Sequence, residues 1–201
     1  MSRRVNKERT RNRLLQAVLK IIHRNGLGAL TTGKAAQLAG VAQPTFYVHF
    51  KSMDEALEQV GSLVSEQLRA AFRSTPEANP DRAAEAVADA VKEGARALVR
   101  DRKVAEVFLR TRRDATIPMG RQMMSLTDDL RASMLALVQQ VRGELSPLDA
   151  QLHTELLVST VFGLSEAYLD RRVIDLDRAA RIASRAILVG IAQTAPVADA
   201  A

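Results

Sequence analysis

The sequence predicts an all-α fold, from its composition and from the spacing of its apolar residues. The chain has 201 residues; 47% are hydrophobic but only 3% aromatic, with ten Gly, six Pro and no Trp. Such a composition is typical of helices that pack closely through small side chains. Apolar residues recur at steps of three and four, and no segment reads convincingly as a strand. We therefore expect about nine helices.

Three of these helices are expected in the first fifty residues. Residues 7–24 carry apolar side chains on one helical face, and Gly26 suits the C-terminal end of that helix. Thr32 can cap a short second helix, because its side-chain oxygen accepts from first-turn amides. Gly40 breaks this helix, and Pro44 fits the first turn of a third helix that ends near Phe50. This order is that of a helix-turn-helix domain.

The rest of the chain is expected to form a larger helical domain. Its helices are predicted at residues 54–73, 82–100, 104–112, 119–141, 150–170 and 177–194, with breaks at "STPEANPD", "DATIPMG" and "GELSPLD". Asp177 is expected to cap the last helix. We divide the chain into a helix-turn-helix domain at residues 1–52, a larger helical domain at residues 53–195, and a disordered tail at residues 196–201.

The positive charge of the chain is concentrated at its N-terminal end. Up to Lys51 there are ten basic residues and one acidic residue, whereas the remainder carries 19 basic and 22 acidic residues. A run of charge on its own is usually a solvated face. Beside a helix-turn-helix pattern, it favours a polyanionic partner, and we expect that partner to be nucleic acid.

Several classes of protein are not favoured by the sequence. No apolar run reaches the roughly 18 residues that a membrane span needs, and the charged N-terminus does not resemble a signal peptide. There is no cysteine, so we expect a cytoplasmic protein without disulfides or thiolate sites. With three histidines, no metal-ligand spacing, no phosphate-binding glycine loop and no nucleophile elbow, we expect neither an enzyme nor a metal or cofactor site.

The segment "RLLQAVLKIIHRNGLGALTTGKAAQLAGVAQPTFYVHFKSMDEALEQV" resembles the N-terminal DNA-binding domain of the TetR family of bacterial transcriptional regulators. The resemblance rests on Gly26, on Thr31-Thr32, on Ala39-Gly40-Val41 and on the run from Thr45 to Phe50. It implies a regulator, commonly a repressor, that binds a palindromic operator in double-stranded DNA as a homodimer and responds to a small-molecule effector. The shorter run "PTFYVHFKSMDEAL" resembles regulators of fatty-acid synthesis that sense acyl-CoA, which suggests a fatty acyl effector.

The third helix carries side chains suited to DNA. Gln43 can read adenine with two hydrogen bonds, and Thr45 can bond to a base or touch a thymine methyl group. Tyr47 and His49 suit phosphate oxygens, although burial against the following long helix is the alternative, which we expect of at most one of them. The complete predicted DNA-binding set is Thr32, Lys34, Gln43, Pro44, Thr45, Tyr47, His49, Lys51, Arg3 and Arg4.

Three positions depart from the family pattern. Ala35 replaces a larger aliphatic residue, and Ala42 replaces a capping Ser, which removes an N-cap worth about 1 kcal/mol. Met53 stands where Lys is common, so the phosphate contact at that position is in doubt. Lys51 is a candidate to replace it.

The second domain offers a candidate pocket and a candidate dimer interface. Adaptable apolar residues form the candidate effector pocket: Phe108, Leu109, Met119, Met123, Met124, Met134, Phe162 and Tyr168. Small residues spaced along the last two helices form the candidate dimer interface: Ser159, Gly163, Ala167, Ala179, Ala183, Ala186 and Gly190. The alternatives are an ordinary core for the first set and packing within one chain for the second. Arg110, Arg112 and Arg113 suit the phosphates of an acyl-CoA, but we favour a solvated loop for them.

Three functions remain to be distinguished. The leading one is a ligand-responsive repressor. The others are an architectural DNA-binding protein without an effector, and a small-molecule enzyme. An architectural protein would bind DNA with little regard to sequence, whereas a regulator loses about 1–3 kcal/mol for each wrong base pair.

Overall fold

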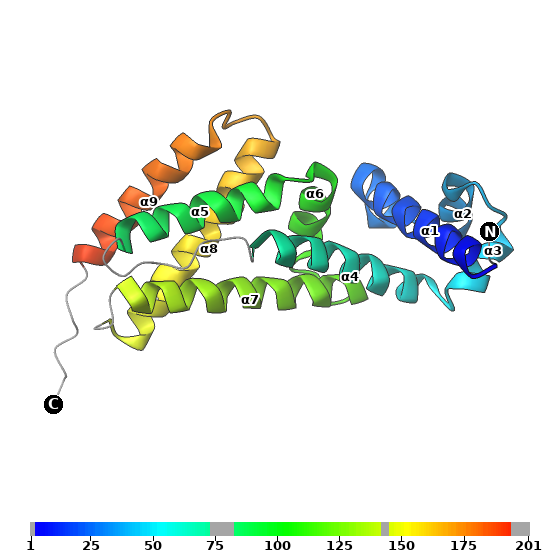
Figure 1. Cartoon of the computed structure of the whole chain (residues 1–201), viewed down its shortest axis with the longest axis horizontal. Helices are drawn as coiled ribbons and strands as arrows, with labels where there is room; N and C mark the ends of the chain where they lie inside the picture. Colours follow the sequence, from blue (N-terminus) through cyan, green and yellow to red (C-terminus); the bar gives the residue numbers. More distant parts are fainter. Residues whose placement is uncertain (1–2, 73–82, 142–144, 194–201) are drawn as a thin grey trace. The chain divides into compact units, whose positions relative to one another are not determined.

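A computed structural model describes residues 3–72, 83–141 and 145–193 of the chain. Within these ranges the secondary structure consists of nine α-helices and one 3-10 turn, without strands (Figure 1). The helices are α1 (Arg3–Asn25), α2 (Thr32–Ala39), α3 (Gln43–His49), α4 (Met53–Phe72), α5 (Ala83–Val99), α6 (Arg102–Thr111), α7 (Pro118–Val141), α8 (Pro147–Leu169) and α9 (Leu176–Gln193). The all-α prediction is confirmed. The predicted tail at residues 196–201 lies outside the described residues.

The core of the helix-turn-helix domain forms from one face of α1. Leu14, Val18 and Ile22 are each at most 1% exposed and follow one another at four-residue steps. Helix α1 ends where Gly26 adopts a positive φ of 78° and donates its N–H to the Ile22 carbonyl at 3.0 Å. This is the glycine C-terminus that the sequence predicts.

The turn between α2 and α3 requires glycine for two reasons. Gly40 adopts the left-handed conformation (φ 68°), which a side chain strains. A Cβ at this position would also lie 2.8 Å from Nη2 of Arg13, which donates hydrogen bonds to the carbonyl oxygens of Ala39 and Gly40. These hydrogen bonds of Arg13 join the turn to α1, and a side chain at Gly40 would collide with the Arg13 guanidinium.

Replacing Gly40 with alanine is expected to lower the free energy of unfolding by about 1–2 kcal/mol, the cost of a left-handed non-glycine residue. Displacement of Arg13 adds to that loss. Urea denaturation followed by circular dichroism measures the change. Gly28→Ala is the matched control, because Gly28 has no positive φ and no atom within 4 Å of an added Cβ. Equal effects of the two substitutions would contradict the prediction.

The chain forms two compact units, and α4 and α7 each contribute to both. Of the described residues, 3–67 and 101–125 form the first unit, and 68–72, 83–100, 126–141 and 145–193 form the second. Helix α6 therefore groups with α1, α2 and α3.

Within the first unit, polar contacts join α1 to α6. Arg110 donates to the backbone carbonyl of His23 at 2.9 Å, and Nε2 of His23 lies 3.1 Å from Glu106. Lys103 donates to Gln16 at 3.1 Å, and Asp101 caps α6 by accepting from the amide of Lys103. His23 thus has a structural contact, and Arg110 belongs to a helix rather than to the solvated loop that we favoured from the sequence.

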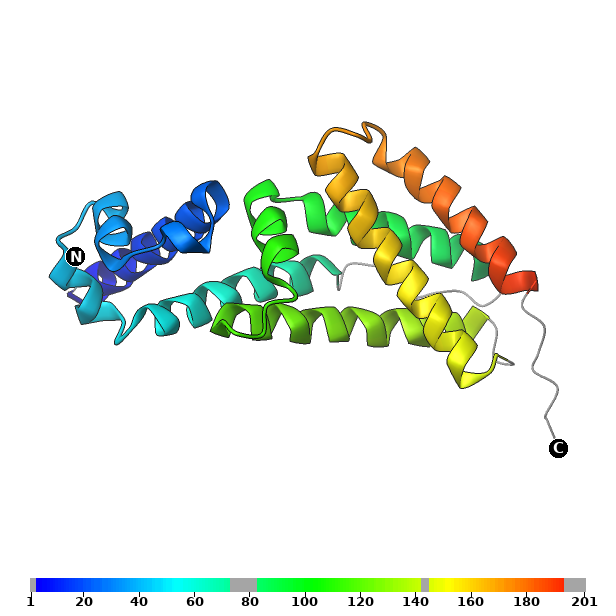
Figure 2. The ribbon, with the colours of Figure 1, turned by 180° about the vertical axis from the view of Figure 1, so that it is seen from behind.

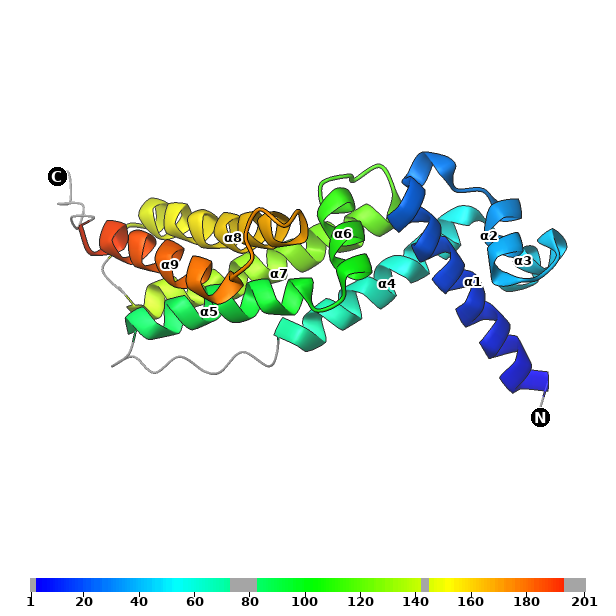
Figure 3. The same cartoon turned by 90° about the horizontal axis from the view of Figure 1, so that it is seen from above.

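The second unit is built around α5, which packs against α8 and α9 (Figures 2 and 3). Gly94 permits a close approach, since a Cβ there would lie 3.4 Å from the Val161 side chain. Arg96 binds both carboxylate oxygens of Asp177, one of them at 2.8 Å. The predicted cap at Asp177 is wrong. Asp175 accepts the Arg178 amide at 2.9 Å and so caps α9.

None of the described helices combines the length and the apolar character needed to cross a membrane.

Candidate nucleic-acid interface

Helix α3 has a buried side and an exposed side. Phe46 and Phe50 are at most 1% exposed, and their ring centroids lie 5.2 Å apart. Gln43, Pro44, Tyr47 and Val48 are exposed; we call these four residues the exposed face of α3. The two aromatic rings hold a helix of only seven residues in place. The exposed face of α3 therefore presents both polar and apolar side chains to solvent, and the two buried rings anchor the helix that carries them.

The N-terminus of α2 supplies a further part of this surface. Thr31, not Thr32, is the N-cap, and its side chain accepts the Lys34 amide at 3.2 Å. The predicted cap at Thr32 is therefore wrong by one residue. Thr32 instead accepts a hydrogen bond from Nε2 of Gln43 at 3.0 Å, and its hydroxyl lies 3.5 Å from that of Tyr47. Three residues predicted to contact DNA thus touch one another.

Helix α3 begins without a side-chain cap. Ala42 occupies the N-cap position, and its side chain offers no hydrogen-bonding group. This agrees with the expected loss of the Ser cap at this position. Thr45, in the first turn of the helix, is half-buried, and its amide donates to the Ala42 carbonyl at 2.9 Å. Pro44 in the first turn lacks the amide that would otherwise need a partner.

His49 lies on the buried side of α3, which corrects its predicted placement among the phosphate contacts. Its side chain is 7% exposed, and Nδ1 has no hydrogen-bond partner among the described residues. The pKa of His49 is lowered, first by burial and then by the positive charges of Arg11 and Lys7. Of the two residues for which burial was the alternative, His49 is buried, whereas Tyr47 is 55% exposed.

The lowered pKa of His49 predicts a loss of stability in acid. The unfolded chain takes up the proton more readily than the folded chain, so the free energy of unfolding should fall as the pH drops below about 6.5. Urea denaturation between pH 7.5 and pH 5 measures this dependence. A His49→Gln variant should lose the part of the slope due to this residue, and a His23→Gln variant should keep it. An unchanged slope in His49→Gln would contradict the assignment.

The basic residues near the N-terminus divide into internal and exposed ones. Arg11 donates to Gln59 at 3.0 Å and to the His49 carbonyl at 2.5 Å, and its guanidinium lies 4.7 Å from the centre of the Phe50 ring. Together with Arg13 above Gly40, it therefore acts inside the domain. Not all of the basic residues counted up to Lys51 are therefore available to a polyanionic partner.

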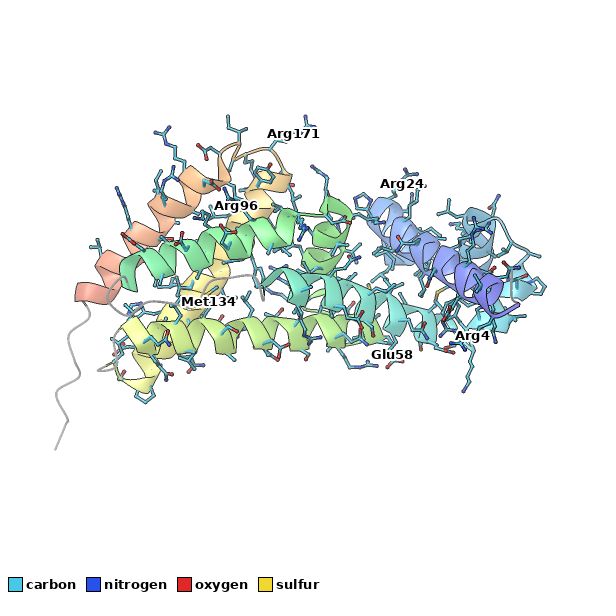
Figure 4. The ribbon with its side chains drawn as sticks, viewed as in Figure 1. Arg4, Arg24, Glu58, Arg96, Met134 and Arg171 are labelled. Atoms are coloured by element: carbon cyan, nitrogen blue, oxygen red, sulfur yellow. The ribbon has the colours of Figure 1, made fainter. Side chains whose placement is uncertain are left out.

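The remaining predicted cations are placed as follows. Arg4, labelled in Figure 4, is exposed on α1, and the side chain of Arg3 lies outside the described residues. Lys34 is exposed and donates to the Ala29 carbonyl at 3.1 Å. Lys51, two residues after the end of α3, is exposed, whereas Met53 is half-buried. Lys51 is therefore better placed than Met53 for a phosphate contact.

Sequence reasoning missed Val48 as a surface residue. Its side chain is 66% exposed, and it follows exposed Pro44 by one helical turn. The spacing of Phe46, His49 and Phe50 at steps of three and one defines the buried side and leaves Val48 outside it. That spacing was readable in the sequence.

The helix-turn-helix domain has a recognisable family. Residues 14–60 match the family model for bacterial regulatory proteins of the tetR family. The N-terminal domain belongs to the TetR family. The family model describes regulatory proteins, so the match identifies residues 14–60 as a DNA-binding domain and favours a regulator over an enzyme. The resemblance found in the sequence is confirmed.

Solved structures with the same fold cover nearly the whole chain. A TetR-like transcriptional regulator from Rhodococcus sp. RHA1 is 17% identical with a TM-score of 0.77, covering 92% of this chain and 97% of its own. The TetR-family regulator PfmR from Thermus thermophilus is 20% identical with a TM-score of 0.69, covering 89% and 95%. The fatty acid degradation regulator FadR from Bacillus halodurans is 18% identical with a TM-score of 0.66, covering 89% and 94%. These likenesses extend the TetR fold beyond residue 60. No match was found among curated protein sequences.

The residues predicted to line an effector pocket differ in exposure. In the first unit Phe108, Met119 and Met123 are at most 1% exposed, whereas Met124 is 39% exposed. Leu109 is half-buried.

In the second unit Met134 (labelled in Figure 4) and Phe162 are buried, whereas Tyr168 is 39% exposed. Met124 and Tyr168 are therefore not part of an enclosed apolar lining.

Tyr168 belongs instead to an open surface pocket of about 310 Å³ in the second unit. The pocket lies beside the turn between α8 and α9 and includes Arg96 of α5, a residue labelled in Figure 4. Its lining comprises Arg96, Val99, Tyr168, Ile174, Asp175, Leu176 and Asp177.

The small residues predicted for a dimer interface lie on partly exposed faces of α8 and α9. Ser159, Gly163, Ala186 and Gly190 are exposed, while Ala167, Ala179 and Ala183 are half-buried. Sequence reasoning missed the larger apolar side chains beside them. Leu148, Leu152 and Leu156 on α8 and Ile182 and Val189 on α9 are each 52% to 65% exposed. The four-residue spacing of the three leucines is the signal that could have identified this face.

Proposed function

We propose that the protein is a ligand-responsive repressor that binds a palindromic operator as a homodimer. The observation that carries the proposal is the exposed face of α3, held by buried Phe46 and Phe50 and supported by Thr32 on α2. A short helix of this kind suits the major groove, where Gln43 can pair with adenine and the apolar Pro44 and Val48 can meet thymine methyl groups. Tyr47, Lys34 and Lys51 suit phosphates, and each phosphate neutralised adds about 0.9 to the salt slope.

The domain assignment follows this proposal. Residues 1–52 would bind DNA, and residues 53–195 would bind the effector and the partner subunit. The site of action would be the cytoplasm, where the operator is.

Dimerisation is supported by the exposed apolar side chains of α8 and α9. A monomer seldom leaves a row such as Leu148, Leu152 and Leu156 in water, because its burial against a second copy is favourable. The small residues on the same helices allow two pairs of helices to approach closely. A two-fold dimer would place its two copies of α3 about 34–36 Å apart, one turn of DNA.

The effector that we propose is a small apolar or amphipathic molecule. Within the first unit, the buried side chains of Phe108, Met119 and Met123 are apolar, and methionine adapts readily to apolar ligands. An acyl chain would gain about 0.8 kcal/mol for each methylene group that it buries. The fold shared with FadR from Bacillus halodurans, a fatty acid degradation regulator, supports a fatty acyl compound as the first candidate. To release DNA, the effector must bind the released form more tightly by a few kcal/mol.

Binding to selected DNA tests the proposal. Duplexes enriched from a random library by the purified full-length protein give the operator, and fluorescence anisotropy gives the affinities for it and for its variants. Gln43→Ala is expected to lose about 1–3 kcal/mol of discrimination at one base pair in each half-site. A long-chain acyl-CoA is expected to weaken binding. An equally small loss on every sequence would support the architectural alternative instead.

A further inference from the structure

The contact between Thr32 and Gln43 raises the question of what fixes the orientation of a glutamine amide at the first position of α3. Gln43 is exposed, and an unsupported glutamine of this kind would lose side-chain entropy on binding a base. Here Nε2 donates to Oγ1 of Thr32 at 3.0 Å. A Cβ at Gly33 would lie 3.7 Å from Oε1 of Gln43, so the amide lies against the first turn of α2.

Thr32 is a fixed support for this amide. It begins a helix that Thr31 caps and whose Ala35, Ala36 and Ala39 are at most 5% exposed. The Thr32 hydroxyl has one hydrogen to donate and two lone pairs. It accepts from Gln43, and its oxygen also lies 3.5 Å from Oη of Tyr47, one turn further along α3. Gln43, Thr32 and Tyr47 therefore form a continuous chain of polar groups.

The direction of donation along this chain follows from the chemistry of phosphate. Tyr47 is 55% exposed and suits a phosphate oxygen, which at neutral pH can only accept hydrogen bonds. On DNA, Tyr47 must therefore give its single hydrogen to the phosphate, and its oxygen is left to accept from Thr32. Thr32 then has no hydrogen left for Gln43, so it can only accept from Nε2. In that orientation Gln43 offers a base Oε1 as acceptor and the second Nε2 hydrogen as donor.

We propose that Thr32, acting with Tyr47, is a positioning residue that makes Gln43 select adenine over guanine. Adenine presents a donor at N6 and an acceptor at N7, which match the two groups that Gln43 has left. Guanine presents two acceptors, O6 and N7. It would require the amide to turn over, with Thr32 donating to Oε1, and a Thr32 that already donates to Tyr47 cannot do so. The inference rests on the proposed binding of α3 in the major groove.

The test compares four duplexes that differ only at the base pair read by Gln43. Full-length protein selects an operator from a random library, and the Gln43→Ala variant locates this base pair as the one at which preference is lost. Competition binding then gives the ratio of affinities for adenine and guanine. A well-formed bidentate contact corresponds to roughly 5- to 150-fold discrimination. Thr32→Val removes the hydroxyl with little change of shape and should lower the ratio at least about fivefold, whereas Thr32→Ser should keep it.

Two further variants separate positioning from other roles. Tyr47→Phe should lower the ratio as well as the overall affinity, because Thr32 is then free to donate to Gln43. Lys34→Gln should weaken binding to all four duplexes by the same factor, since a phosphate contact carries no base preference. Thermal unfolding checks that each variant is folded.

The inference is overturned if folded Thr32→Val weakens all four duplexes equally, if the wild type prefers guanine, or if Gln43→Ala alters no base preference. Each of these results leaves the DNA-binding function intact. A wild-type protein that enriches no duplex would overturn the proposed function, and this inference with it.

Discussion

Leu152→Glu is expected to convert the protein to a monomer and to weaken its binding to a palindromic operator by at least about 100-fold. The side chain of Leu152 is 54% exposed at the centre of the row formed by Leu148, Leu152 and Leu156. If a second copy covers this row, the substitution places a carboxylate in an apolar interface. Removing that charge from water without a cationic partner is unfavourable, so the dimer is destabilised. Once the dimer is lost, each half-site must be bound independently, and the gain from linking two sites is commonly 100- to 10,000-fold, by order of magnitude.

Sedimentation velocity measures the change in mass, and anisotropy on the full operator measures the loss of affinity. Gln151→Glu is the matched control, because it adds the same charge at the neighbouring exposed position of α8 without removing an apolar side chain. The circular dichroism of Leu152→Glu should be unchanged. A Leu152→Glu variant that remains a dimer would show that α8 does not contribute this row to the interface. A monomeric variant that kept full operator affinity would contradict the proposal that a dimer binds a palindromic operator.

The helices of the chain were readable from its sequence because apolar spacing and glycine breaks are local signals. The predicted helix at residues 7–24 lies within α1, and that at residues 119–141 differs from α7 by one residue. Gly26 and Gly40 both have the positive φ that their predicted roles require. Phe46 and Phe50 are buried as their four-residue spacing predicts.

The two N-cap predictions were wrong because, in each case, two nearby residues have side chains equally able to cap a helix. Thr31 and Thr32 can both cap a helix, and the extended conformation of Thr31 (φ −139°, ψ 155°) decides between them. Asp175 and Asp177 pose the same problem, which Arg96 decides by binding Asp177. In each pair the residue that does not cap has a contact with another helix, namely Thr32 with Gln43 of α3 and Asp177 with Arg96 of α5.

The hydrogen-bond partners of long side chains could not be predicted from the sequence. Arg11 and Arg13 count as positive charge near the N-terminus, yet they bind Gln59, His49 and the turn at Gly40. His49 shows a different limit. Its spacing from Phe46 by three residues agrees with burial, whereas the chemistry of its imidazole suits a phosphate contact. Its 7% exposure agrees with the spacing.

Phe46→Ala is expected to lower the free energy of unfolding by about 3–5 kcal/mol, the usual cost of truncating a fully buried phenylalanine. Phe46 is 0% exposed and contacts two other aromatic rings, with centroids 5.2 Å away at Phe50 and 5.6 Å away at Tyr47. The edge-to-face contact matters for function, because the buried Phe46 ring holds the exposed Tyr47 ring in position. Loss of Phe46 should therefore weaken operator binding even where the domain remains folded.

Phe46→Leu separates these two effects, since it keeps most of the buried volume but removes the aromatic contact. Its cost in unfolding free energy should be clearly smaller than that of Phe46→Ala, because the cavity is smaller. Urea denaturation and operator binding, measured on the same samples below the unfolding transition, give both quantities. If α3 acts as a support anchored by its aromatic underside, Phe46→Leu should lose operator affinity out of proportion to its loss of stability. Full affinity in Phe46→Leu would mean that aliphatic packing is enough to orient Tyr47, and that Thr32 alone holds its hydroxyl in place.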